Sequence, residues 1–383
     1  MAAEKNNKTL NVPNLRFPEF SGEWERCTIG DITRNFSLRN KDKIQYPMFS
    51  VTNSRGFVPQ SEQFEDREMI GEDIKAYKII HEGDFAYNPA RINVGSIAKY
   101  DKSEPCMISS LYVCFKALPQ INNEWLMQLL KTPKMNFYYN VNGEGGVRVY
   151  LFYPNFARIR TSYPSLAEQQ KIASFLSLLD QRIETQRKII EDLKKLKDAI
   201  SFILFTSETC DKWELSNLAT IVMGQSPSSQ YYNTDNEGLP LIQGNLDITK
   251  GKLTPRIYSS EMTKKCHTGD VILTVRAPVG EVAIADFDAC IGRGVCAIRP
   301  FNSTYSVLIY QFLQHYKPKW ISLEQGSTFT SVSRNDIMSI KIGIPSIQAI
   351  EILNILDDKI SIEDVILNNL NSQKNYLLTQ LFI

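Results

Sequence analysis

The sequence predicts an α+β protein in which the same architecture occurs twice. Each copy consists of a mixed α/β domain followed by a long helix. Three observations support this prediction. Residues 164–206 carry one uninterrupted helical pattern, residues 345–383 repeat it, and the domains before each helix share short motifs. The two long helices are expected to pair as an antiparallel coiled coil, which would make the chain pseudo-two-fold symmetric.

The first long helix is predicted between Pro164 and Phe205. No Pro or Gly follows Pro164 in this stretch, and apolar residues recur at spacings of three and four, as in a helix that presents a seam to another helix. Ser165 and Glu168 form an S-x-x-E pattern, which predicts a capping box at the start. Roughly 40 helical residues would span about 60 Å, which is more than one small domain needs.

The second long helix begins after Pro345. Each of its seam residues follows its counterpart in the first helix at the same distance along the chain, as Leu353 follows Leu176, and we call this distance the repeat offset. Polar seam positions correspond at this offset too, Lys197 with Lys374 and Gln186 with Glu363, and the second copy lacks four residues near its start. Two unrelated core helices would not share this spacing. The predicted coiled-coil interface comprises Leu176, Leu179, Ile183, Ile190, Leu193, Ile200 and Leu204, and then Leu353, Leu356, Ile360, Leu367, Leu370, Leu377 and Leu381.

The repeat divides the chain into five segments. Residues 1–23 are expected to form a loose N-terminal arm, because Pro13 and Pro18 interrupt any helix. Short apolar and β-branched runs separated by Gly, Asn and Pro predict mixed, mainly antiparallel domains, each opened by a Trp-Glu pair. The predicted segments are the arm at 1–23, the first domain at 24–163, the central helix at 164–206, the second domain at 207–344 and the C-terminal helix at 345–383.

Composition limits the class of protein. The chain has 383 residues, 43% hydrophobic and 22% charged, which is typical of a globular protein with two cores. Seven cysteines without a C-x-x-C pair argue against a disulfide framework or a zinc site. The N-terminus has no apolar signal core, so we expect a cytoplasmic protein. A net charge of +1 does not by itself indicate nucleic-acid binding.

Two short motifs occur in both domains. H-x-G-D is found at His81–Asp84 and again at His267–Asp270, and R-x-x-V-G follows it, beginning at Arg91 and at Arg276. Gly-Asp before an apolar run is typical of a turn that leads into a strand, and Val-Gly is typical of a bend. These residues are interpreted first as parts of the fold.

No arrangement of residues predicts catalysis or a bound metal. The three histidines form no H-E-x-x-H motif and no short ligand pair, and the Gly-rich segment 142–148 fits neither a dinucleotide loop nor a P-loop. The segment YNPAR at 87–91 has only one Pro and no accompanying cofactor loop, so it is interpreted as a turn.

These features together resemble a known family. Two variable domains alternate with repeated coiled-coil helices, each helix follows a Pro, and the first helix begins P-S-L-A-E-Q-Q-K-I-A-x-F-L-x-L-L-D at 164–180. This resembles the specificity subunit of a type I restriction–modification system, and the resemblance extends from Trp24 to the C-terminus. The second helix departs from the pattern, since SIQAIEI at 346–352 lacks the Glu-Gln-Gln-Lys-Ile run.

The resemblance implies a non-catalytic subunit with two target-recognition domains. Each domain would read one half of a bipartite, asymmetric site in double-stranded DNA, and the helices would set the spacer between the halves. The partners implied are two methyltransferase subunits and two restriction subunits that translocate DNA. The chain itself would bind no cofactor and no metal; S-adenosylmethionine, ATP and Mg are expected on the partner subunits.

DNA-contacting residues are sought on polar loops that correspond between the two domains, because base edges are read by Arg, Lys, Asn, Gln, Ser or Thr. The loops 52–55 and 243–252 form one such pair, and 143–150 and 325–334 a second. Arg91 and Arg276 fit either a role in the fold or a phosphate contact. The candidates for base edges are Asn53, Arg55, Gln243 and Asn245, those for phosphates are Lys250 and Lys252, and the second pair of loops offers Arg148, Ser327 and Thr330.

Two other classes of function stay open on the sequence. A methyltransferase or nuclease acting alone would need a cofactor loop and a catalytic motif. A coiled-coil scaffold that does not bind DNA would account for the helices, but it would leave the matched polar loops of the two domains unexplained.

Overall fold

The computed structural model describes residues 10–62, 74–145, 149–207, 211–325 and 331–383. The chain divides into two compact units, the first made of residues up to Gln186 together with Ile366–Ile383, and the second of Arg187–Val365. Both division points fall inside the long helices, so each helix contributes to both units. The five segment boundaries proposed from the sequence remain a prediction.

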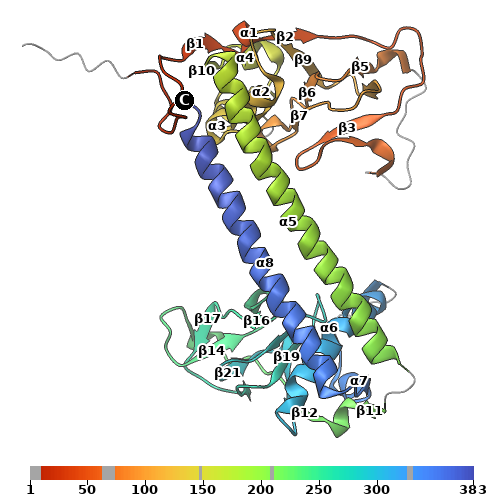
Figure 1. Ribbon diagram of the computed structural model, residues 1–383. Coiled ribbons are helices and arrows are strands. Elements are labelled where there is room, and N and C mark those ends of the chain that lie inside the picture. The colour runs from red at the N-terminus through yellow and green to blue at the C-terminus, as the bar shows by residue number, and fades with distance from the viewer. Residues whose placement is uncertain (1–9, 63–73, 146–148, 208–210, 326–330) are drawn as a thin grey trace, which may run out of the picture. The chain divides into compact units, whose positions relative to one another are not determined.

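The first unit contains a four-stranded antiparallel sheet and three two-stranded ladders (Figure 1). The sheet has the order β2 (Thr33–Phe36), β9 (Val113–Ala117), β6 (Phe85–Tyr87) and β7 (Ile97–Lys99). The ladders pair β1 (Glu25–Thr28) with β10 (Arg160–Tyr163), β3 (Phe49–Thr52) with β4 (Gly56–Pro59), and β5 (Lys78–Ile80) with β8 (Cys106–Ile108). The shorter helices are α1 (Ile29–Ile32), α2 (Asn123–Leu130), α3 (Pro133–Asn142) and α4 (Tyr153–Ala157), with 3₁₀ turns η1 (Gln60–Glu62), η2 (Ile74–Ala76) and η3 (Ile92–Val94).

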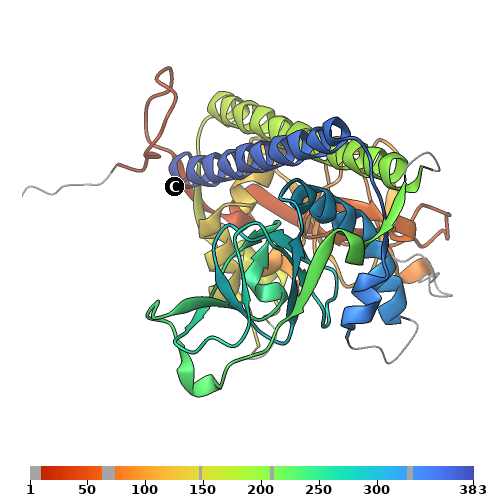
Figure 2. The ribbon, with the colours of Figure 1, turned by 90° about the horizontal axis from the view of Figure 1, so that it is seen from below.

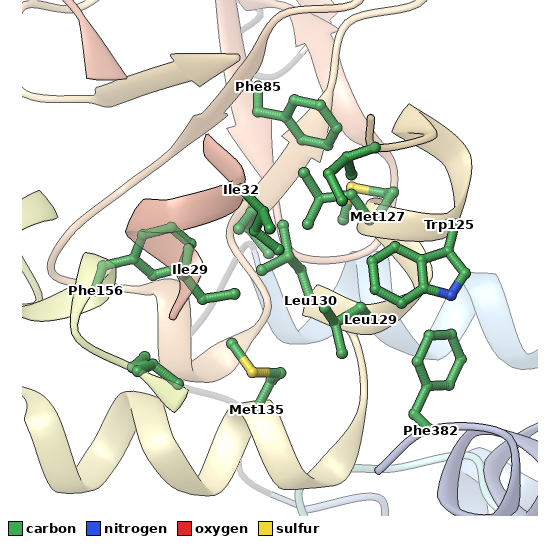
Figure 3. Close-up of a cluster of buried hydrophobic side chains, with 14 of the residues drawn as sticks. Ile29, Ile32, Phe85, Trp125, Met127, Leu129, Leu130, Met135, Phe156 and Phe382 are labelled. Carbon is green, nitrogen blue, oxygen red and sulfur yellow. The ribbon is translucent and has the colours of Figure 1, made fainter. Parts of the chain in front are cut away.

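The core of the first unit joins this domain to the end of the chain. Figure 3 shows Phe382, which follows the C-terminal helix, pointing at Trp125 of α2 among the buried side chains of α1, α2 and β6. The Phe382 ring centroid lies 5.8 Å from that of Trp125 and 6.5 Å from that of Trp24. Aromatic rings at these separations add to the free energy gained by burial alone. The last residues of the chain therefore help to complete the core of the first domain.

The second unit repeats the four-stranded antiparallel sheet and adds a second sheet. The order β12 (Ala219–Met223), β22 (Val295–Pro300), β19 (Val271–Thr274) and β20 (Val282–Ile284) corresponds to the order of β2, β9, β6 and β7. In the second sheet, β14 (Leu239–Ile242) pairs parallel with β21 (Ala289–Ile291), an exception to the antiparallel pattern expected. The second sheet has the order β13 (Tyr232–Asn233), β17 (Ile257–Ser259), β14 (Leu239–Ile242), β21 (Ala289–Ile291) and β18 (Lys265–Cys266).

Apart from its parts of the two long helices, the second unit has two ladders, two helices and three 3₁₀ turns among its described residues. The longer helix, α6 (Thr304–Gln325), contacts the sheet through β20 and is seen beside the C-terminal helix in Figure 2. The rest are the ladders β11 (Lys212–Glu214) with β23 (Lys341–Gly343) and β15 (Ile248–Thr249) with β16 (Lys252–Leu253), the helix α7 (Arg334–Met338), and η4 (Leu215–Asn217), η5 (Ser229–Tyr231) and η6 (Asn245–Asp247).

The two long helices are confirmed. α5 spans Leu166–Thr206 and α8 spans Ile347–Gln380. In the first unit, the start of α5 shares the core with Leu378 near the end of α8, and in the second unit, the end of α5 shares the core with Ile350 and Leu353 of the α8 start. The helices are therefore antiparallel within each unit. Among the described residues, no helix is long and apolar enough to cross a membrane.

Of the residues predicted for the coiled-coil interface, all but Leu381 lie within the two helices, Leu381 follows the end of α8, and each is at least half-buried. Six are buried: Leu176, Ile183, Ile190, Leu353, Leu370 and Leu381. The other eight are half-buried: Leu179, Leu193, Ile200, Leu204, Leu356, Ile360, Leu367 and Leu377. For each of these residues, contact with the other long helix stays a prediction.

The H-x-G-D motif forms the same turn in both units. The backbone N–H of His81 donates to Asp84 Oδ2 at 2.9 Å, and that of His267 donates to Asp270 Oδ2 at 2.8 Å. Gly83 and Gly269 both have a left-handed φ, of 83° and 90°. Both aspartates are buried and ion-paired, Asp84 with Lys116 and Asp270 with Arg299. The motif is therefore a structural turn, as the first interpretation had it.

The start of α5 differs from the predicted capping box. The N–H of Glu168 donates to Ser165 Oγ at 3.4 Å, as expected, but the Glu168 carboxylate turns away from the cap. It is buried, and it accepts two hydrogen bonds from Arg16, at 2.8 and 2.7 Å, and one from Trp24 Nε1 at 3.2 Å. The side chain fixes the arm and the first domain to α5 instead of closing the helix end.

The N-terminal arm is not loose over its described part. The N–H of Leu15 donates to the carbonyl of Gln380 at 3.0 Å, and the Phe17 ring lies edge-on to Phe175 at 5.8 Å. Asn11 is buried, and its side chain donates to the Trp24 carbonyl and to Ser162 Oγ. Pro13 and Pro18 prevent a helix, as expected, but extended backbone can still bind through side chains and turns.

We predict that Glu168→Gln will release the arm. The amide keeps one acceptor oxygen but turns an N–H₂ donor toward the Arg16 guanidinium, so charge-assisted bonds worth about 1.5–3 kcal/mol each are weakened. Cleavage by trypsin after Arg16, followed by mass spectrometry, should accelerate about tenfold or more because it follows the population of the undocked arm. Glu191→Gln is the matched control, since Glu191 pairs with Lys195 on the exposed surface of α5. Equal cleavage rates in both variants would contradict this role for Glu168.

Candidate nucleic-acid interface

In the first unit, two candidate residues lie on the turn between β3 and β4. Asn53 and Arg55 are exposed there. Thr52 Oγ1 accepts a hydrogen bond from the Arg55 N–H and donates to the Gly56 carbonyl, both at 3.1 Å. Arg55 also pairs with Glu62 at 3.4 Å, but both side chains are more than half exposed, so the pair restrains the guanidinium only weakly. The turn presents these two polar side chains on a short, hydrogen-bonded scaffold.

The R-x-x-V-G segment of this unit packs against the same turn. Arg91 is exposed before η3, and Gly95 follows with a φ of 100°. A Cβ atom at Gly95 would lie 3.3 Å from the Asn53 carbonyl oxygen, and Ser96 Oγ donates to the Val51 carbonyl at 2.7 Å. Glycine is needed here because two loop backbones approach closely. The loops that carry Asn53 and Arg91 are thereby brought together, while Arg148 lies outside the described residues.

A polar cleft of about 450 Å³ separates these loops from the C-terminal helix. Asn53 and Gly95 line one side, and Asn371 and Lys374 of α8 line another. The asparagine amides offer donors that suit phosphate or base-edge oxygens, whereas Lys374 is paired with Asp180. The sequence analysis did not identify the α8 residues as part of this surface, although the pairing of Lys374 with Lys197 in the repeat had singled out that position.

In the second unit, the equivalent turn joins β15 to β16 and carries Lys250. Lys250 Nζ bonds Asp364 Oδ2 of α8 at 2.7 Å. Gly251 has a φ of 76°, and a Cβ atom there would lie 2.1 Å from the Tyr310 hydroxyl. Burial, and then the charge of Asp357, raise the pKa of Tyr310 to about 12, so its hydroxyl stays protonated and can donate. Lys252 is exposed on β16, where a phosphate could reach it.

Gln243 and Asn245 lie on the loop before this hairpin, and both are half-buried. The loop is held by Asp247, which is buried, accepts from the Gln243 N–H at 2.8 Å and pairs with Arg256 Nε at 2.9 Å. A Cβ atom at Gly294 would lie 2.0 Å from the Gln243 carbonyl oxygen, so the neighbouring loop requires glycine at position 294. The side chains of Gln243 and Asn245 therefore stand on a fixed backbone.

Arg276 is exposed beside the second matched loop. It forms a β-bridge with Ser331, and the Val332 N–H donates to the Val275 carbonyl at 2.9 Å. Ser327 and Thr330 lie outside the described residues. A second cleft, of about 420 Å³, is lined by Lys250, Gly280, Lys194 and Lys317. Lys194 precedes Asn371 by the repeat offset, so both units place the hairpin turn, the Val-Gly bend and a long helix around one cleft.

Comparison with known proteins decides the family. The model of the family described as "Type I restriction modification DNA specificity domain" matches residues 21–195 and 208–372, which is most of the chain and nearly the same span in each half. The chain belongs to this family. Its members are DNA-recognition components, so the paired polar loops are candidate DNA-contacting surfaces of a specificity protein.

One relative and two solved structures agree with this assignment. A Methanocaldococcus jannaschii protein assigned as the specificity subunit of the type I restriction enzyme MjaX is 29% identical over 374 residues, covering 89% of this chain and 87% of its own. A type I restriction–modification S subunit from M. genitalium has a TM-score of 0.62 at 16% identity, covering 97% of this chain and 99% of that one. A chain from a structure describing complex assembly and conformational transition of the type I R-M system has a TM-score of 0.62 at 20% identity, with 94% and 97% covered. The two solved structures support the fold.

We predict that Lys252→Ala will weaken binding to duplex DNA without changing the preferred sequence. A lysine that neutralises one phosphate contributes about 0.9 to the slope of log affinity against log salt, so that slope should fall by about this amount. Fluorescence anisotropy at several salt concentrations measures both quantities. Lys212→Ala, at another exposed lysine of the same unit, is the control and should leave the slope unchanged. A slope that does not change in Lys252→Ala would remove Lys252 from the phosphate contacts.

Proposed function

We propose that the chain is the specificity subunit of a type I restriction–modification complex and that it reads a bipartite, asymmetric site in double-stranded DNA. Each unit would read one half of the site through its own loops. This proposal rests on one observation: the two units repeat the same fold but carry different residues on the equivalent hairpin turn. Asn53 and Arg55 lie on this turn in the first unit, and Lys250 and Gly251 lie on it in the second. Two different loops on the same scaffold would read two different half-sites, so the complete site would be non-palindromic.

The partners proposed are two methyltransferase subunits and two restriction subunits, which would carry the S-adenosylmethionine, ATP and Mg. In the described residues, no group of three His, Cys, Asp or Glu side chains is placed to hold a metal. A protein that selects chromosomal sites for methylation works where the DNA is, so we also propose that it acts in the cytoplasm. Each of Asn53, Arg55, Arg91, Gln243, Asn245, Lys250, Lys252 and Arg276 remains proposed as a DNA contact.

The long helices offer matching surfaces to two copies of one partner. Phe175 and Leu178 are 40% and 64% exposed on α5, and Ile352 and Ile355 are 49% and 66% exposed on α8. The second pair follows the first by the repeat offset. Large apolar side chains exposed together mark interaction surfaces. Their repetition supports the docking of one methyltransferase subunit on each pair. A scaffold that does not bind DNA is not favoured by any observation on the chain.

We predict that the chain alone will transfer no methyl group and that the cognate methyltransferase will restore adenine methylation at one bipartite motif. Exchanging residues 24–163 for the corresponding domain of another family member should then alter one half of the motif only, because contacts far apart contribute independently. Methylome sequencing of cells that carry each pair reads the motif directly. Methylation by the chain alone, or altered bases in both halves, would refute the proposal.

We also predict that the helix pair sets the spacer. Four residues inserted into both α5 after Gln186 and α8 after Val365 add about 6 Å and advance the helix by about 40° beyond one turn. With base pairs about 3.4 Å apart, the methylated halves should separate by one or two base pairs, with unchanged bases.

The control for this prediction inserts the four residues into α5 only. That variant cannot keep both Lys374 against Asp180 and Lys197 against Asp357, so it should lose thermal stability and methylation. An active double insertion that keeps the original spacer would show that the helices do not set it.

A further inference from the structure

Each unit contains the same junction of three side chains, contributed by a domain helix and by both long helices. In the first unit, Gln128 Nε2 of α2 donates to Asp180 Oδ2 of α5 at 2.9 Å, and Lys374 Nζ of α8 bonds the other oxygen, Oδ1. In the second unit, Gln311 Nε2 of α6 donates to Asp357 Oδ2 of α8 at 2.7 Å, and Lys197 Nζ of α5 bonds Oδ1 at 2.6 Å. The long helices exchange roles between the two junctions.

The repeat shows that the two junctions are equivalent. Asp357 follows Asp180 by the repeat offset, and Lys374 follows Lys197 in the same way. The glutamines come from the helix that packs on the four-stranded sheet in each domain, α2 in one and α6 in the other. The same atoms therefore make the same bonds in the two compact units, which is unlike the scattered ion pairs of a protein surface.

The glutamine of each junction is a buried polar side chain where an apolar residue would also fit, whereas the side chains of Asp180 and Asp357 are 39% and 32% exposed. Gln311 is 1% exposed and Gln128 is 9% exposed. The Oε1 atom of each is buried and has no hydrogen-bond partner among the described residues. A leucine would fill similar space without burying an acceptor, so packing alone does not account for glutamine at both positions. Buried polar groups that are retained at a cost in stability are best known as devices that fix register.

We propose that Asp180 and Asp357 are positioning residues that fix the register of each recognition domain on the helix pair, and thereby the spacer that the protein accepts. Each carboxylate divides its two oxygens between a domain helix and a long helix. A domain that slides along α5 or α8 must give up a charge-assisted bond, whereas apolar contacts would re-form one turn away. The inference rests on the proposed function, because the spacer has meaning only for a bipartite site.

The second junction has additional bonds. Lys197 Nζ also donates to Gln314 Oε1 at 2.6 Å, and Gln311 Nε2 also donates to Asn354 Oδ1 at 3.0 Å. The Lys197 side chain is 11% exposed and that of Lys374 is 18% exposed. These additional bonds do not involve Asp357 and remain when it is replaced, so substitution of Asp357 is expected to affect spacer selection no more than substitution of Asp180.

The test compares spacer selection in Asp357→Asn, Asp180→Asn and the charge exchange Lys197→Asp with Asp357→Lys, each assembled with the cognate methyltransferase. Methylation is measured on duplexes that carry both half-sites with the native spacer or one base pair more or less. We expect both asparagine variants to keep the half-site bases and to raise methylation of the altered spacers about tenfold relative to the native one. The charge exchange should restore wild-type selection, because it rebuilds the pair between the long helices and lets Gln311 Oε1 accept from the introduced lysine, and Glu191→Gln should match the wild type throughout.

A lower melting temperature with unchanged spacer selection would reduce the junctions to a stabilising role and overturn the inference, as would spacer selection that the charge exchange fails to restore. If the wild-type assembly methylates no bipartite motif, the proposed function fails first. Hydrogen exchange on the full chain then tests the junction by itself: Asp357→Asn should raise amide exchange in α6 and in residues 350–360, and leave β12 and β22 unchanged. Equal exchange in the variant and the wild type would overturn the register role as well.

Discussion

The architecture of each unit depends on an ion pair between a lysine of one long helix and an aspartate of the other. An apolar seam with three-four spacing allows two helices to pair in several registers, since each shift by one heptad restores similar contacts. Lys197 reaches Asp357 in only one of these registers, and Lys374 reaches Asp180 in only one. The hydrophobic seam therefore supplies much of the free energy of pairing, and the charges select the direction and the register.

The candidate DNA-contacting loops depend on close approach at glycines as well as on side-chain hydrogen bonds. Gly95 lies against the Asn53 carbonyl, Gly251 against Tyr310, and Gly294 against the Gln243 carbonyl. In each case a Cβ atom would push away a loop that carries a candidate DNA contact. The side chains on these loops differ between the two units, while the Asp84 and Asp270 turns are the same in both.

The sequence predicted the long helices, their offset, the mainly antiparallel domains and the H-x-G-D turn, because each depends on local periodicity or on turn chemistry repeated within one chain. It could not predict where side chains at the ends of α5 would bind. Glu168 in an S-x-x-E pattern predicts a capping box, and only the folded chain shows that Arg16 and Trp24 compete for its carboxylate. The docking of the arm was missed for the same reason, since its partners lie far away in the sequence. The DNA contacts proposed from loop composition remain predictions, because composition does not say which side chain faces a base.

One departure from the repeat lies beside the Glu168 carboxylate. Trp24 and Trp213 open the two domains in the same way, yet Trp24 is 2% exposed and Trp213 is 44% exposed. The indole N–H of the buried Trp24 donates to Glu168, whereas Ala349 stands at the corresponding distance after Pro345 and offers no carboxylate. The arm that covers Trp24 also exists once, because the chain has one N-terminus. The two units are thus alike where the long helices pair and differ where the first unit uses the ends of the chain.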